Sequence, residues 1–263
     1  MKCIILAAGY ATRLYPLTEN YPKPLLKVGD KTIIDHLISD VDKSGAVDEY
    51  IIVSNHKFAP HFRYWAFGDS FGVEGECKSW PRRCEAISDV KVTVLDDGST
   101  SNESRLGAVK DILFAYDKLQ IDDELLVLAG DNLLDFSLSS FVDYSIKSTT
   151  SCIMRYYEED EARLKKCGVV DFDVHDRVIS MEEKPQQPRT KWCCPPFYYY
   201  TRSDARLIRK GLTEGCGSDA PGSYVAWLCS QVPVHAMLMP GSRYDIGSLE
   251  SYKKVCDSYK GIL

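Results

Sequence analysis

Residues 6–13, with the sequence LAAGYATR, combine small side chains with a terminal arginine directly after an apolar run. In an open α/β sheet, ligands bind beyond the carboxyl ends of the strands, and a small-residue loop there lets backbone N–H groups approach a phosphate closely. Arg13 adds a planar fork of donors suited to phosphate oxygens, and Lys23 adds a second cation between two prolines that stiffen its backbone. Together these residues predict a cradle for a triphosphate.

The loop taken alone is also typical of an ordinary tight turn at Gly9, with Arg13 and Lys23 in solvent. It matches neither a Walker loop, which ends in Gly-Lys-Ser/Thr, nor the dinucleotide pattern G-x-G-x-x-G. Phosphate binding therefore has to be judged together with the rest of the chain.

Composition and charge narrow the class of protein. The chain has 263 residues, of which 44% are hydrophobic and 27% charged, and these fractions exclude disordered and collagen-like proteins. Its mean hydropathy is -0.23. A net charge of -6 argues against a nucleic-acid surface but is compatible with a local basic pocket for a small phosphorylated ligand. We expect a small-molecule partner, with no nucleic acid and no membrane, while homo-oligomerisation stays open.

The longest apolar runs, CIILAA and ELLVLAG, are far shorter than the roughly 20 residues that a bilayer span needs. The amino terminus also lacks a basic segment followed by an apolar one, so we expect a cytoplasmic protein. The ten cysteines should then be free thiols. Cys193 and Cys194 are adjacent, a spacing unsuited to two ligands of one tetrahedral zinc.

Strands and helices are expected to alternate in the first 150 residues. Apolar runs predict strands at 2–8, 50–54, 90–95 and 124–131. Apolar positions at helical spacing predict a helix that Thr32 caps and Gly45 ends, and a second helix over 103–119. Strands that are apolar on both faces and alternate with helices belong in a parallel sheet covered on both sides, so this half is predicted to be α/β and doubly wound.

The second half is less regular and is predicted to extend the same sheet. Strands are expected at 151–157, 165–173, 177–185 and 197–201, followed by helices near 203–212 and 220–230. The chain has no Pro/Gly/Ser-rich linker and no internal repeat, so we expect one domain over 1–263. Within it, 1–150 would form the nucleotide-binding half and 151–263 the acceptor-binding half.

Four segments resemble the signature motifs of the sugar-1-phosphate nucleotidyltransferases, such as glucose-1-phosphate thymidylyl- and uridylyltransferases. They occur in the family's order and at about its spacing, at residues 6–26 (LAAGYATRLYPLTENYPKPLL), 128–132 (LAGDN), 182–185 (EEKP) and 244–252 (YDIGSLESY). The resemblance covers nearly the whole chain. It implies a Rossmann-like fold with a mixed, mostly parallel sheet and helices on both faces. The implied reaction joins a nucleoside triphosphate (NTP) to a sugar 1-phosphate and releases pyrophosphate.

The resemblance also assigns roles to individual residues. Asp131 and Asp245 match the two aspartates that bind Mg²⁺, and two carboxylates with phosphate oxygens suit such a hard cation. Lys184 matches the lysine that binds the acceptor's phosphate, and Glu183 the residue that contacts sugar hydroxyls. The implied catalytic residues are Arg13, Lys23 and Asp131. The implied nucleotide-binding residues are Leu6, Ala7, Ala8, Gly9, Tyr10, Ala11, Thr12, Arg13, Lys23, Gly107 and Ala108.

Departures from the family pattern leave both substrates open. Ala11 stands where many relatives carry glycine, and residues 96–112 keep Gly107 and Ala108 but lack the glutamine that faces the base in thymidylyltransferases. The base could therefore come from dTTP, UTP or CTP. The second hypothesis is a cytidylyltransferase for phosphocholine, a phosphonate or another small phosphorylated alcohol. A third is a non-catalytic, nucleotide-binding regulatory subunit, which the presence of Arg13, Lys23 and Asp131 disfavours.

Overall fold

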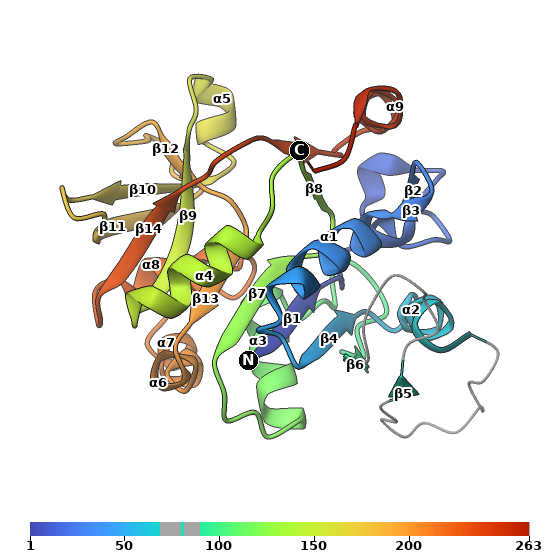
Figure 1. The fold of residues 1–263 in the computed structure, drawn as a ribbon, viewed down its shortest axis with the longest axis horizontal. Helices are drawn as coiled ribbons and strands as arrows, with labels where there is room; N and C mark the ends of the chain where they lie inside the picture. The colour runs from blue at the N-terminus through green and yellow to red at the C-terminus, as the bar shows by residue number, and fades with distance from the viewer. Residues whose placement is uncertain (69–79, 82–89, 263) are drawn as a thin grey trace. The chain divides into compact units, whose positions relative to one another are not determined.

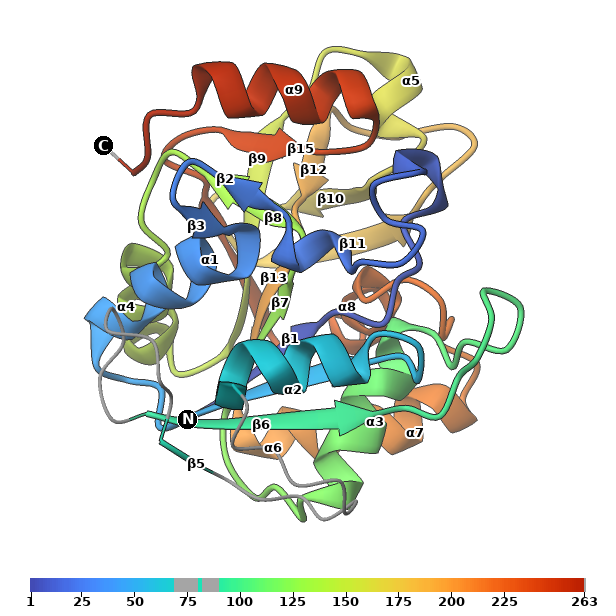
Figure 2. The same ribbon diagram turned by 90° about the vertical axis from the view of Figure 1, so that its right-hand side faces the viewer.

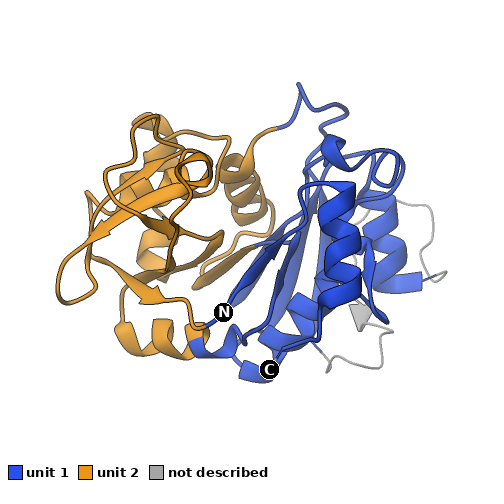
Figure 3. Cartoon of the chain, turned by 90° about the horizontal axis from the view of Figure 1, so that it is seen from above, with its two compact units in different colours: residues 1–105, 129–140, 241–263 blue, residues 106–128, 141–240 orange. Residues whose placement is uncertain are grey.

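The computed structural model describes residues 1–68, 80–81 and 90–262. The chain forms two compact units (Figure 3). Unit 1 consists of Met1–Arg105, Ala129–Ser140 and Gly241–Leu263, and unit 2 of Leu106–Leu128 and Phe141–Pro240. The units interleave along the sequence and do not divide near residue 150. The assignment of 1–150 and 151–263 to nucleotide and acceptor stays a prediction.

Three parallel strands form the centre of unit 1, in the order β1 (Lys2–Leu6), β4 (Glu49–Ser54) and β6 (Lys91–Asp96). The short β5 (Trp80–Pro81) joins β6 in the antiparallel sense. All six residues of β4 are buried, as expected for a parallel strand that is covered on both faces. The predicted parallel pairing of the first strands is therefore confirmed.

The helices of unit 1 begin and end at residues with clear local signals. In α1 (Ile33–Val41), the Thr32 hydroxyl accepts a hydrogen bond from the Asp35 N–H while the Asp35 side chain accepts from the Thr32 N–H, which completes a capping box. Gly45 then takes a left-handed conformation with φ 63° after the short turn η3 (Asp42–Ser44). The predicted helix from Thr32 to Gly45 is confirmed.

A second helix of unit 1, α2 (Ala59–Phe67), packs against β4 and β6 (Figure 2). Its start at Phe58 is fixed by Asn55, whose Oδ1 accepts from the Phe58 N–H at 2.9 Å. The sequence interpretation missed this helix, because Pro60 in its first turn resembles a turn signal in an isolated sequence.

Short elements complete unit 1 around a small apolar cluster. Strands β2 (Lys27–Val28) and β3 (Lys31–Thr32) pair with each other, as do β8 (Asn132–Leu134) and β15 (Arg243–Asp245). Helix α9 (Leu249–Ser258) lies alongside β2, and the Tyr252 hydroxyl donates to the Lys27 carbonyl at 2.6 Å (Figure 1). The buried cluster contains Leu14, Leu26, Val28, Ile33, Leu133, Ile246 and Val255.

Unit 2 is built on a mixed sheet with strand order β11-β10-β12-β9-β13-β7, and β14 also pairs with β9. Only the pairing of β14 with β9 is parallel among the described strands of this unit. The strands are β7 (Leu125–Ala129), β9 (Ser151–Tyr157), β10 (Gly168–Phe172), β11 (Val178–Glu183), β12 (Trp192–Cys194), β13 (Phe197–Tyr200) and β14 (Val234–Leu238).

The first helix of unit 2 starts later than the sequence predicts. Helix α3 covers Ala108–Lys118, whereas we expected 103–119. Gly107 precedes it with φ 93°, and the Ser104 hydroxyl accepts hydrogen bonds from the N–H groups of Thr100 and Ser101 in a separate turn. Serine side chains that bond nearby backbone in this way compete with helix formation. The remaining helices are α4 (Ser139–Ser148), α5 (Glu161–Leu164), α6 (Arg202–Ala205), α7 (Ile208–Thr213) and α8 (Gly222–Leu228).

The predicted fold class is confirmed, since the chain is an α/β protein with a mixed, Rossmann-like arrangement of strands and helices. None of the described helices has the length and apolar character that a membrane span requires. None of the described cysteines forms a disulfide.

Candidate active site

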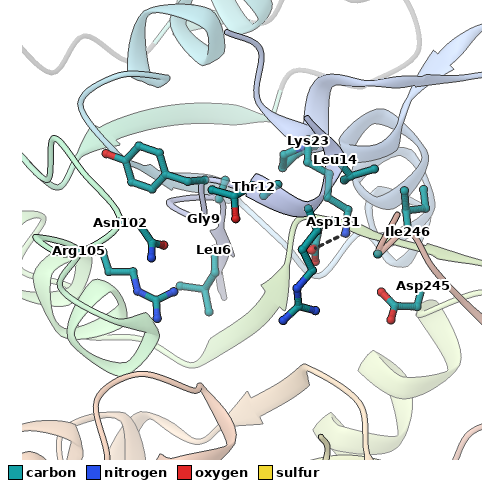
Figure 4. A pocket seen from close by; sticks show the side chains of 16 residues that line it. Leu6, Gly9, Thr12, Leu14, Lys23, Asn102, Arg105, Asp131, Asp245 and Ile246 are labelled. Atoms are coloured by element: carbon teal, nitrogen blue, oxygen red, sulfur yellow. Dashed lines mark hydrogen bonds and ion pairs between the residues drawn. The ribbon is translucent and has the colours of Figure 1, made fainter. Parts of the chain in front are cut away.

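A cavity of about 510 Å³ opens in unit 1 at the carboxyl end of β1 (Figure 4). Lys23, Asp131 and Asp245 lie on one side of this view, and Asn102 and Arg105 on the other. The pocket is lined by Leu6, Ala7, Gly9, Tyr10, Ala11, Thr12, Arg13, Leu14, Lys23, Pro24, Asn102, Arg105, Asp131, Asp245, Ile246 and Gly247.

Hydrogen bonds to buried polar groups fix the loop that follows β1. The Ala7 N–H donates to the Val53 carbonyl at 2.8 Å, which continues the pairing of β1 with β4. The Asn55 amide donates to the Ala8 carbonyl at 3.0 Å, and the Thr18 hydroxyl donates to the Ala11 carbonyl at 2.8 Å. The last two bonds direct the carbonyls of Ala8 and Ala11 toward the protein. All three bonds hold the loop at the edge of the pocket.

The backbone of the loop is strained at Ala11, which has a left-handed φ of 47° at the start of the short helix η1 (Thr12–Leu14). Only glycine adopts this conformation without cost, so Ala11 has a conformational strain that a glycine would relieve. At Gly9, an added Cβ would meet no atom within 4 Å. Space therefore remains beside the Gly9 backbone, on a residue that lines the pocket.

An ion pair between a buried lysine and a partly exposed aspartate joins two of the predicted residues. Lys23 begins the short helix η2 (Lys23–Leu25) between Pro22 and Pro24, is 7% exposed, and places its Nζ 2.8 Å from Oδ2 of the partly exposed Asp131 (Figure 4). Desolvation favours the protonated carboxyl, but the positive charges of Lys23 and Arg243 outweigh it and lower the pKa of Asp131. Asp131 is therefore ionised at neutral pH.

Gly130 explains how Asp131 reaches the loop. A Cβ at Gly130 would lie 2.8 Å from the Ile5 side chain, and the Gly130 N–H donates to the Leu6 carbonyl at 3.0 Å. A larger residue would force the Ile5 side chain to shift, so glycine permits this close approach, which sets Asp131 beside the end of β1. Antiparallel pairing of β15 with β8 then places Asp245 opposite Asn132, one residue from Asp131.

The two aspartates provide a donor set that fits Mg²⁺. Asp131 and Asp245 line the same pocket, and both offer carboxylate oxygens, which hard divalent cations prefer. The described part of the chain contains no group of three or more His, Cys, Asp or Glu placed to hold a metal. Two protein carboxylates suit Mg²⁺, which usually keeps several waters and takes further oxygens from substrate phosphates.

The predicted acceptor residues lie in unit 2, at the end of β11. Lys184 has φ 51°, and its N–H donates to the Cys167 carbonyl at 3.0 Å. Its ammonium is half exposed and lies 3.9 Å from a carboxylate oxygen of Asp219. A residue before proline with a left-handed backbone carries strain that is found mostly where function requires it. Burial raises the pKa of Glu183 to about 6, although the charge of Lys184 partly offsets this effect.

Three predicted nucleotide-binding residues do not line the pocket of unit 1. Ala8 is buried, with its carbonyl bound to Asn55. Gly107 and Ala108 belong to unit 2 at the start of α3, where a Cβ at Gly107 would lie 2.5 Å from the Ser218 carbonyl oxygen. This close contact and its positive φ are sufficient structural reasons for glycine at 107. Contact of Ala8, Gly107 and Ala108 with the nucleotide stays a prediction.

The sequence interpretation did not name Asn102 and Arg105, whose side chains line the pocket (Figure 4). Both follow β6, a parallel strand whose carboxyl end is where ligands usually bind in an open α/β sheet. That position was the available signal, but the sequence gives no indication of which residues in a serine-rich loop face a ligand.

With this geometry established, comparison with known proteins identifies the class. A family profile described as "Nucleotidyl transferase" matches residues 2–260, and the chain belongs to this family. The predicted resemblance to sugar-1-phosphate nucleotidyltransferases is confirmed.

Individual relatives match this chain at low sequence identity. The chain is 26% identical to the bifunctional protein GlmU of Methanocaldococcus jannaschii over 98% of its own length and 55% of the relative's. It is 28% identical to a glucose-1-phosphate thymidylyltransferase of Neisseria meningitidis serogroup A over 76% of its own length and 61% of the relative's. The chain thus spans little more than half the length of these relatives.

Among solved structures, a UDP-glucose pyrophosphorylase in complex with UDP-glucose has the same fold. Its TM-score is 0.77 at 20% identity, with 98% of this chain and 97% of that chain covered. At this identity the likeness establishes the fold alone.

Proposed function

We propose that this protein transfers a nucleotidyl group from an NTP to a sugar 1-phosphate and releases pyrophosphate, using Mg²⁺. The observation that carries the proposal is the ion pair between the buried Lys23 and the partly exposed Asp131, beside the small-residue loop in one pocket of unit 1. Burying a lysine costs free energy unless an opposite charge pairs with it. Here Asp131 is that partner, and the pair fixes the cation in the pocket where a polyphosphate would lie. Family membership supports the same reaction.

The pocket supplies positive charge in two forms. Arg13 is exposed at the pocket and makes no hydrogen bond or ion pair with the described residues, so its five donors are available for phosphate oxygens. Lys23 is fixed by its neighbours and acts as a point charge. Backbone N–H groups of the loop after β1 complete the cradle, because the loop carbonyls of Ala8 and Ala11 are bound on the protein side.

Asp131 and Asp245 would hold Mg²⁺ in this pocket. When bound, the metal neutralises charge on the phosphates and favours departure of pyrophosphate. Asp131 keeps its negative charge because Lys23 and Arg243 lower its pKa, so it can act as a ligand throughout the neutral range.

The chemical step requires no protein nucleophile and no general base. An oxygen of the acceptor's phosphate, already anionic near pH 7, forms a bond to the α-phosphorus as the bond from that phosphorus to the bridging oxygen of pyrophosphate breaks. Catalysis then consists of positioning and charge neutralisation. Lys184 would bind the acceptor's phosphate, and Glu183 would accept hydrogen bonds from its hydroxyl groups.

Replacement of Lys184 tests the assignment of acceptor binding to unit 2. A charge-assisted hydrogen bond to phosphate is worth roughly 1.5 to 3 kcal/mol, so Lys184→Ala should lower kcat/KM for the acceptor by about 10- to 150-fold. The NTP dissociation constant should change by less than about twofold, since surface substitutions away from a site usually stay within ±0.5 kcal/mol. Steady-state kinetics with both substrates varied, and calorimetry of NTP binding, measure the two effects.

Lys165→Ala removes another exposed lysine of unit 2 and serves as the matched control, with kinetics expected to match the wild type. If Lys184→Ala weakened NTP and acceptor binding by the same factor, Lys184 would belong to the triphosphate site and the assignment would be wrong.

A further inference from the structure

Two glycines of unit 2 face the carboxylate of Glu183. Gly168 is the first residue of β10, and Gly222 is the first residue of α8. Neither has a positive φ, so the backbone would accept an L-amino acid at both positions. The reason for glycine must lie in the space around them.

Added side-chain atoms at these positions would collide with the same two side chains. A Cβ at Gly222 would lie 2.2 Å from Oε2 of Glu183 and 2.8 Å from Cε of Met181. A Cβ at Gly168 would lie 2.4 Å from Cε of Met181 and 3.1 Å from Oε2 of Glu183. Met181 and Glu183 are two residues apart on β11, so their side chains leave the strand on the same face.

We infer that Gly168 and Gly222 are positioning residues, which form a slot that holds the Glu183 carboxylate in the orientation needed to accept hydrogen bonds from acceptor hydroxyl groups. The inference deepens the proposed function and rests on it for the identity of the ligand. The slot itself follows from the distances alone.

Burial, and to a lesser extent the groups around the slot, set the pKa of Glu183. Burial raises its pKa to about 6; Lys184 on the same strand end lowers it, while Cys167 before β10 and Asp219 before α8 raise it. The carboxylate is therefore ionised above about pH 6 and acts there as a hydrogen-bond acceptor only. Below this pH it can also donate.

Gly222→Ala separates positioning from folding. The atoms that the new methyl group would meet are the ends of two flexible side chains, so they can move without a shift of the backbone. Alanine also has a higher helix propensity than glycine, which favours α8. We expect the variant to fold with a melting temperature at neutral pH no lower than that of the wild type, because the Glu183 carboxylate leaves the slot and is no longer desolvated.

Three measurements on the full chain test the inference. The acceptor KM of Gly222→Ala should rise about tenfold, the usual effect of a lost hydrogen bond to a charged group, and the NTP dissociation constant should stay within twofold. The Glu183 titration, followed by NMR of its carboxyl carbon, should move from about 6 toward the ordinary 4.5 as the carboxylate meets solvent. Gly217→Ala, whose methyl group would meet only the Ser223 side chain within 4 Å, is the control.

Shortening the acid provides a second, independent variant. In Gly222→Ala, the further change Glu183→Asp removes one methylene group and relieves the collision, so the two substitutions should be strongly non-additive in acceptor KM. Additive effects would overturn the inference. An unfolded Gly222→Ala, or a folded one with unchanged acceptor KM and unchanged Glu183 titration, would overturn it as well. The NMR titration requires no turnover, so it tests the slot even in an inactive protein. A wild-type protein that transfers no nucleotide would contradict the proposed function and not the slot.

Discussion

Lys23 and Asp131 are far apart in sequence, and both depend on local backbone features to meet at 2.8 Å. Two prolines fix the backbone on either side of Lys23, and Gly130 allows the close approach that brings Asp131 to the end of β1. Each charge makes the other tolerable in a partly desolvated site, because an unpaired buried charge costs several kcal/mol. At the residue scale, the pair is therefore the feature most sensitive to substitution.

We expect Asp131→Asn to lower kcat by about two orders of magnitude or more at saturating Mg²⁺, since charge neutralisation at the transferring phosphoryl group is lost. The protein should keep its fold, because asparagine has the same shape, but it should be less stable than the wild type because the buried Lys23 loses its counter-charge. Steady-state rates and circular dichroism measure the two effects, and Asp30→Asn, at an exposed position of unit 1, is the control. Unchanged rates would show that Asp131 is not a metal ligand.

Strained residues show what the sequence could not reveal at this scale. Of the residues that the motifs single out, Arg13, Lys23 and Asp245 line the pocket, and their roles there stay predictions. The motifs gave no sign that Ala11 and Lys184 take left-handed backbones, because neither residue type favours that conformation. Such strain is imposed by surrounding packing, so it becomes visible only in the folded chain.

At the scale of elements, the packing of β10, β11 and α8 around Glu183 has a consequence for stability. The native pKa of about 6 lies above the ordinary 4.5, so the native state binds an extra proton between these values. The Glu183 carboxyl group therefore contributes most to the free energy of unfolding when it is protonated. This contribution is lost as the pH rises from 4.5 through 6.

Glu183→Gln removes that titration. The stability of the variant relative to the wild type should rise between pH 4.5 and 7 by up to about 2 kcal/mol, at 1.36 kcal/mol per pKa unit. Urea unfolding at a series of pH values measures the difference in free energy of unfolding between the variant and the wild type. The contributions of the other titrating groups are the same in both proteins and cancel in this difference. Glu182→Gln, at the exposed neighbouring position, should show no such trend. A flat difference for Glu183→Gln would mean that its carboxyl is not desolvated.

Elements with a strong periodic pattern were predictable, and the short ones were not. Strands β1, β4 and β6 and helix α1 follow apolar patterns and a capping signal that are local in sequence. Strands β8 and β15 have three residues each, too few for any periodicity, yet their pairing brings Asp245 beside Asp131. The site therefore depends on a contact that only the family resemblance, and no local pattern, could anticipate.

For the whole molecule, the division into two units differs from a simple division of the sequence. Residues 129–140 and 241–263 return to unit 1 after long excursions through unit 2, and they carry the two aspartates. A chain that interleaves in this way cannot be divided at one boundary from composition alone, because neither unit is continuous. The predicted residues for nucleotide phosphates and metal lie in unit 1, and those for the acceptor in unit 2.

We propose that these 263 residues join two phosphorylated small molecules and release pyrophosphate. The most direct measurement is pyrophosphate release by the purified protein with Mg²⁺, in which each of dTTP, UTP, CTP, ATP and GTP is combined with a panel of sugar 1-phosphates, phosphocholine and a phosphonate. We predict release that requires both an NTP and a sugar 1-phosphate, with an equal amount of nucleotide-sugar and no covalent enzyme-nucleotide adduct. Pyrophosphate release only with a non-sugar acceptor, or no release with any pair despite NTP binding, would contradict the account.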